Sequence, residues 1–101
     1  MRFLGKLQGI GTLATAEGPI GPAEYELDGY LMRPGEVVAS GELRMKSSGL
    51  QGRFDRRGLH LVTAEGRILS LRFTGKLSER DGRIAHIDVY QGLPAETEWR
   101  R

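Results

Sequence analysis

The chain has 101 residues, enough for one ordinary domain with a real core but too few for two. It contains no cysteine, which excludes disulfides and thiolate metal ligands, and its 39% hydrophobic and 28% charged residues exclude a disordered chain. The formal net charge is only +2, so the distribution of charge along the chain is more informative than the total. No apolar run reaches the roughly eighteen residues that cross a bilayer, so we expect no membrane segment and a cytoplasmic location.

Glycine and turn residues define the expected fold. Fifteen glycines disfavour long helices, and turn signals such as Arg33-Pro34-Gly35 separate segments of strand length. Connections this short suit antiparallel pairing, because parallel strands need long crossovers. We therefore predict an all-β fold, an antiparallel meander of about seven strands curled into a small barrel or orthogonal sandwich. Residues 1–101 form a single β domain in this prediction, with residues 93–101 as a short helical turn or tail.

Alternation of apolar and polar residues predicts which way each strand faces. The predicted strands cover residues 2–15, 24–32, 36–46, 68–77 and 83–91, and residues 49–63 form a hairpin. In chain order, the side chains expected to point inward are Phe3, Leu7, Leu13, Tyr25, Leu27, Leu31, Val37, Ala39, Leu43, Met45, Leu50, Phe54, Leu59, Leu61, Leu69, Leu71, Phe73, Leu77, Ala85, Ile87 and Val89.

Glycines share the inward face with these large apolar residues. A glycine inside a strand usually marks a bend, a bulge or the close approach of another backbone. A tightly coiled barrel explains this pattern, and the alternative is a cavity for a small ligand inside the barrel. The seven glycines are Gly5, Gly9, Gly11, Gly29, Gly41, Gly52 and Gly75.

Charge is divided between two parts of the chain. Residues 17–42 carry six acids and one base, a balance of −5, whereas residues 44–76 carry eight bases and two acids, a balance of +6. Ordinary solvation of a sheet surface accounts for such charges. The alternatives are an anionic partner on the basic strands, or self-association between acidic and basic sides that weakens with salt. The candidate face for an anion or a partner consists of Arg44, Lys46, Arg53, Arg72 and Lys76.

Aromatic residues disfavour a nucleic-acid partner. Surfaces that bind single strands combine cations with exposed aromatics. Here, alternation turns four of the aromatics inward, and those left over lie outside the basic stretch. The four inward aromatics are Phe3, Tyr25, Phe54 and Phe73.

Catalytic chemistry has little support in the sequence. The two histidines are fewer than the three or four protein ligands of a metal site, and only His86 and Asp88 share a strand face. We predict no catalytic, metal or cofactor-binding residues and no cofactor.

The leading functional hypothesis is a non-catalytic module that acts by protein interaction or as a homo-oligomer. The alternative is a binding protein for a small apolar or anionic ligand in the barrel, and an enzyme with an unrecognised site comes third. The single tryptophan, Trp99, is expected to cap an open end of the barrel. A dimer that resists salt would indicate apolar contacts, for example at Ile84, Tyr90 or Trp99.

Overall fold

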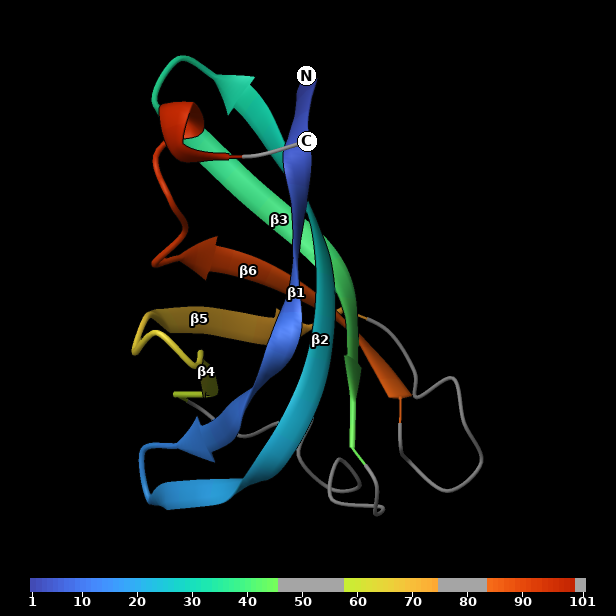
Figure 1. Cartoon of the computed structure of the whole chain (residues 1–101), viewed down its shortest axis with the longest axis vertical. Coiled ribbons are helices and arrows are strands. Elements are labelled where there is room, and N and C mark those ends of the chain that lie inside the picture. Colours follow the sequence, from blue (N-terminus) through green and yellow to red (C-terminus); the bar gives the residue numbers. More distant parts are fainter. Residues whose placement is uncertain (46–57, 75–83, 100–101) are drawn as a thin grey trace.

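The computed structural model describes residues 1–45, 58–74 and 84–99 and confirms the all-β prediction (Figure 1). Every strand pairs with its neighbours in antiparallel orientation, and among these described residues the only helical element is a single 3₁₀ turn, η1. The elements are β1 (Arg2–Thr15), β2 (Gly18–Arg33), β3 (Glu36–Arg44), β4 (His60–Val62), β5 (Ile68–Phe73), β6 (Ile84–Gln91) and η1 (Glu96–Glu98).

The sheet closes into a barrel with the strand order β1-β2-β3-β6-β5-β4. Consecutive strands are neighbours within the meander β1–β3 and within the meander β4–β6, as predicted. The expectation that consecutive strands are neighbours fails between the two meanders, because β3 pairs with β6 instead of β4, and β4 pairs with β1. Closure of the ring explains this correction, since the outer strands of both meanders need partners. Of the predicted hairpin at residues 49–63, the second arm contains β4, and the first arm lies outside the described residues.

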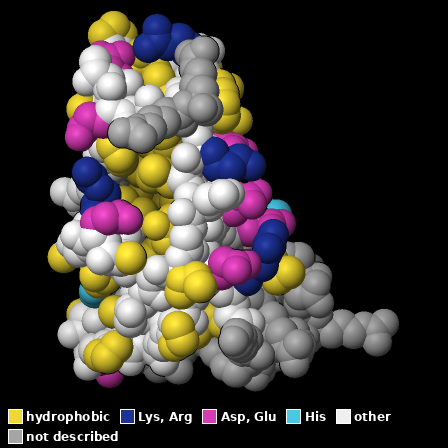
Figure 2. Space-filling view, viewed as in Figure 1, with side chains coloured by type: hydrophobic (Ala, Val, Ile, Leu, Met, Phe, Trp, Pro, Cys, Tyr) yellow, Lys and Arg dark blue, Asp and Glu magenta, His cyan; other side chains and the backbone are white. Residues whose placement is uncertain are grey.

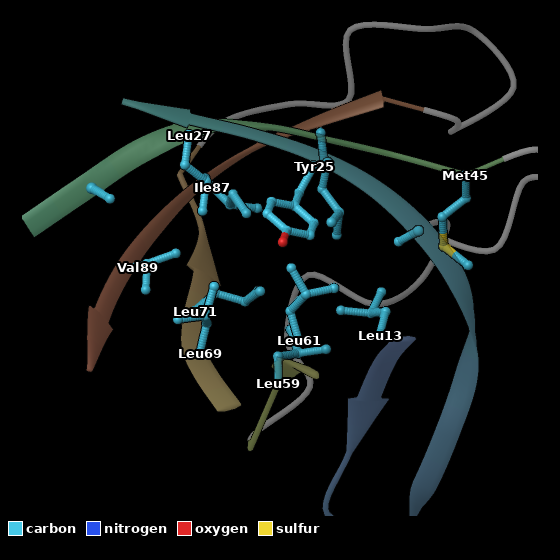
Figure 3. Packing of buried hydrophobic residues seen from close by; sticks show 14 residues of the cluster. Leu13, Tyr25, Leu27, Met45, Leu59, Leu61, Leu69, Leu71, Ile87 and Val89 are labelled. Carbon is cyan, nitrogen blue, oxygen red and sulfur yellow. The ribbon is translucent and has the colours of Figure 1, made fainter. Parts of the chain in front are cut away.

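The core lies inside the barrel, where alternation placed it (Figure 3). Burying one large apolar side chain contributes roughly 1.5–3 kcal/mol relative to leaving it exposed. The core draws on all six strands, and its most completely buried large side chains are Leu13, Leu27, Leu43, Leu61, Leu69, Ile87 and Val89.

The beginning of β1 departs from the predicted alternation. Phe3 was expected to point inward, but its side chain is 43% exposed and its ring meets Tyr30 edge-on at 5.6 Å, whereas Leu4 is only 4% exposed. The pairing register with β2 shifts between Phe3 and Gly5. Gly5 has φ = 151°, a conformation that other residues rarely adopt, so an irregularity here reverses the face of Phe3.

Two inward glycines show why the wall needs residues without side chains. A Cβ atom on Gly41 would overlap the Glu26 carbonyl oxygen of β2, and one on Gly29 would overlap the Trp99 ring. The Trp99 indole donates a hydrogen bond to the Pro94 carbonyl oxygen at 3.1 Å, which holds the ring against β2. Trp99 therefore packs against the barrel core from the C-terminal segment. Its capping of an open barrel end stays a prediction.

The C-terminal segment forms the predicted short helical turn. The Ala95 N–H donates to the Glu98 carboxylate at 2.8 Å, and the Glu98 N–H donates to the Ala95 carbonyl at 2.9 Å. Within the described part of the chain, no helix is long and apolar enough to cross a membrane.

Candidate interaction surfaces

Arg44, at the end of β3, lies among carboxylates. Its guanidinium contacts Glu42 at 2.8 Å and Glu24 on β2 at 3.3 Å. The hydrogen bond to Glu42 and the charges of the neighbouring carboxylates raise the pKa of Arg44 above its ordinary value. Alternation correctly predicted that Arg44 points outward, but it could not show that Glu24 lies opposite it in the register.

Arg72, on β5, lies elsewhere on the outer surface. Its guanidinium carbon is 4.9 Å from the centre of the Tyr90 ring, a cation–π geometry. The Cα of Arg72 is opposite Asp88 of β6, while Arg44 is opposite Ile84 of the same strand, four positions away. Arg44 and Arg72 are thus separated by β6 and do not form one cluster.

The other three members of the predicted basic face, Lys46, Arg53 and Lys76, lie outside the described residues. A basic face that binds an anion or a partner therefore stays a prediction.

The outer side of β2 and β3 carries an acidic face, defined by Glu24, Glu26, Asp28 and Glu42. Figure 2 shows its magenta side chains interspersed with dark blue ones along one side of the molecule. Glu26 and Glu42 are directly opposite each other in the ladder, an arrangement of like charges that is destabilising. Lys6 of β1 approaches Glu26 at 3.3 Å and Asp28 at 3.9 Å, but exposed pairs of this kind contribute at most about 1 kcal/mol.

His86 and Asp88 point outward on β6, as expected. His86 is opposite Glu42, and Asp88 is opposite Ser40. In residues 1–45, 58–74 and 84–99, no three His, Cys, Asp or Glu side chains are close enough to hold a metal ion.

The most distinctive surface is an apolar face on the outer side of β1, β2, β3 and β6. A groove is lined by Met1, Tyr30, Met32, Val38 and Tyr90. Its polar lining residues, which we call the rim, are Glu36, Ser40, Arg72 and Asp88. Phe3 extends the face through its contact with Tyr30. The side chains of Met1, Met32 and Tyr90 are 83%, 45% and 52% exposed. We define the apolar face as Met1, Phe3, Tyr30, Met32, Val38 and Tyr90.

Sequence reasoning missed the apolar face for two reasons. The irregularity beside Gly5 hid the outward position of Phe3. Val38 and Tyr90 were both assigned outward, but nothing in the sequence indicated that their strands β3 and β6 are neighbours. Of the three apolar contacts proposed for a dimer that resists salt, Tyr90 belongs to this face, Trp99 packs against the core, and Ile84 is opposite Arg44.

Side chains lie directly against two of the inward glycines, Trp99 at Gly29 and Tyr25 at Gly9. The Tyr25 ring lies over Gly9, and Figure 3 shows it in the middle of the core with its hydroxyl directed towards Leu61. Burial raises the pKa of Tyr25, and the negative charge of Glu65 raises it further. Within the described residues, the Tyr25 hydroxyl has no hydrogen-bond partner, although the residue is only 7% exposed.

No protein-family model, curated protein or solved structure matches this chain.

Proposed function

We propose that this chain is a non-catalytic β-barrel module that acts by self-association, with the apolar face as the contact between two copies. The observation that carries the proposal is the clustering of exposed apolar side chains. Six large hydrophobic side chains are exposed in the described residues, and four of them, Met1, Phe3, Met32 and Tyr90, belong to this face. Single exposed apolar residues are ordinary on a monomer, whereas a contiguous patch with a polar rim is typical of an interaction site.

The charges at the rim favour a second copy as the partner. A two-fold axis places the same patch on both molecules, so a self-complementary face carries both signs of charge. The rim supplies Arg72 and Asp88 side by side on adjacent strands. In the described part of the chain neither side chain has an ion-pair partner, so each is available to the opposite charge of a second molecule.

Salt distinguishes this interface from the electrostatic one that the charge distribution suggested. Association between acidic and basic stretches weakens as ions screen exposed charges over about 8 Å at physiological ionic strength. Burial of an apolar face does not depend on such screening, and sulfate strengthens it. We therefore expect a dimer that persists at high salt.

Sedimentation equilibrium of the full chain at low and high sodium chloride tests the proposal. We expect a dimer at both salt levels, a monomer for Met32→Glu, and an unchanged dimer for the control Ile68→Glu. Ile68 is also exposed and apolar but lies outside the apolar face. A wild-type monomer at up to about 1 mM contradicts the proposal, because it leaves less than about 4 kcal/mol for association. The same oligomeric state for Met32→Glu and Ile68→Glu also contradicts the proposal.

A further inference from the structure

The two edges of β1 differ in how much of their length is paired. On one edge, β1 pairs with β2 from Arg2 to Thr15. On the other edge, it pairs with β4 only at Thr12, Leu13 and Ala14, because β4 has just three residues. Among the described residues, no strand pairs with this second edge between Arg2 and Gly11. Figure 1 shows β1 extending far beyond the short β4.

The usable part of this open edge is residues 5–11. At its upper end, the C-terminal segment approaches β1, where Arg2 and Glu96 form an ion pair at 3.7 Å. At its lower end, a Cβ atom on Gly11 would come within 2.5 Å of the Val62 carbonyl oxygen, and pairing with β4 begins at the next residue, Thr12. Between these points the register with β2 is regular, and seven residues equal the length of an ordinary strand.

A groove lined by apolar side chains accompanies this edge. Figure 2 shows hydrophobic side chains between β1 and the strands on the opposite side of the barrel. Leu7 of β1 is partly buried and packs against the core, as does Leu93 of the C-terminal segment. The outer side of the same stretch is different, because Lys6, Gln8 and Ile10 alternate with the inward residues there.

We propose that the open edge of β1 binds an extended segment of another protein, which adds one strand to the barrel wall. A row of unpaired N–H and C=O groups is matched best by another extended backbone. The inward side chains of the added strand would enter the apolar groove. Its outward side chains would lie two strands, or about 10 Å, from the acidic face, within reach of lysine or arginine. The partner segment therefore alternates apolar residues with polar ones that include bases.

The usual protections of a strand edge are weak in this stretch. Proteins blunt open edges with lysine, proline or bulges. β1 contains no proline, and its irregularities lie at Phe3/Gly5 and Leu13/Ala14, at the two ends of the open stretch. Its single lysine, Lys6, extends away from the open edge towards Glu26 of β2. Among the residues that the structure describes, no strand, proline or bulge blocks the central residues of the edge.

Hydrogen exchange of the free chain provides the first test. We expect alternate backbone amides in residues 5–11 to exchange rapidly, namely those that point away from β2, while the others are protected by the β1–β2 ladder. Uniform protection of these amides would overturn the proposal, because it would mean that the edge is already paired.

A synthetic peptide provides the second test. The probe has about ten residues in which valine alternates with lysine or threonine, and the matched control carries N-methyl groups on the amides of one edge, which removes their donors. We expect the probe to slow exchange of the amides in residues 5–11 and the N-methylated peptide to bind at least about tenfold more weakly. Leu7→Asp should weaken binding of the probe, whereas Gln8→Glu, on the outer side, should not.

The proposal is overturned if the probe does not slow amide exchange at up to about 1 mM, or if the probe and its N-methylated control bind equally well. It is also overturned if the amides that the probe protects from exchange lie outside β1. Slowing that appears without peptide as the protein concentration rises would identify a second copy as the occupant. The self-association proposal is tested independently of this one, because Met32→Glu alters the apolar face and leaves the β1 edge intact.

Discussion

The inner and outer sides of the barrel wall come from the same strands, but they use apolar residues differently. On the inner side, Leu27 and Ile87 are almost fully buried and large side chains meet across the barrel. On the outer side, Ile10 and Ile68 are exposed outside the apolar face, whereas four of the six exposed large apolar side chains of the described residues belong to that face. The contrast teaches that alternation accounts for the folding core, while outward apolar residues that cluster indicate association.

The largest effect is expected inside the barrel. Leu27→Ala removes a completely buried side chain and should lower the free energy of unfolding by about 2–5 kcal/mol. Tyr30→Ala, on the outer side of the same strand, should cost much less in a monomeric background such as Met32→Glu. Urea unfolding measures both variants. Equal losses would mean that the inner and outer sides are wrongly assigned.

A smaller effect is expected where the C-terminal segment meets the wall. Gly29→Ala places a methyl group where the Trp99 ring lies, and overpacking of this kind costs about 1–3 kcal/mol. Because Trp99 is the only tryptophan, its fluorescence should shift to longer wavelength as the ring is displaced towards water. The control is Ala23→Gly, a change on the same strand that adds no atoms and should leave the emission maximum unchanged. An unchanged emission maximum in Gly29→Ala would contradict the contact between Gly29 and Trp99.

A comparable or smaller effect is expected at the rim of the apolar face. Arg72→Glu and Asp88→Arg should each weaken dimerisation, because each single change brings like charges together across the two-fold axis. The double variant restores opposite charges and should recover most of the loss, about 1 kcal/mol for an exposed pair. Sedimentation equilibrium measures the dissociation constants. Additive losses in the double variant would argue against a contact between Arg72 and Asp88 of two copies.

The smallest effect concerns Tyr25. Its buried hydroxyl has no hydrogen-bond partner in the described residues, so Tyr25→Phe should leave stability at pH 7 unchanged or slightly higher. The fold raises the pKa of Tyr25, which means that it favours the neutral phenol. This contribution is fully present below the ordinary value of 10.0 and is lost as the pH rises towards and through the raised pKa. Urea unfolding from pH 8 to 11 should show a smaller alkaline loss for Tyr25→Phe, and identical profiles would contradict this assignment.

Most of the fold could be predicted from the sequence, because period-two alternation reports local strand geometry. It assigned Leu27 and Ile87 to the core correctly. It failed at Phe3, where one irregularity beside Gly5 reversed the face, and such an irregularity leaves little trace in a strand that is already rich in glycine.

The candidate surfaces were harder to predict because they depend on pairing between distant strands. The apolar face requires β3 to lie beside β6, and ring closure rather than local sequence decides this pairing. The surroundings of Arg44 are a second example, since alternation predicted its outward direction but not its contact with Glu24.

The most direct test of self-association through the apolar face is isotope-filtered NMR on an equimolar mixture of labelled and unlabelled chain. We expect intermolecular NOEs between the Met32 methyl group of one copy and the Tyr30 or Tyr90 ring of the other, at low and at high salt. Intermolecular NOEs confined to the acidic face, or none in a sample that sediments as a dimer, would contradict the account.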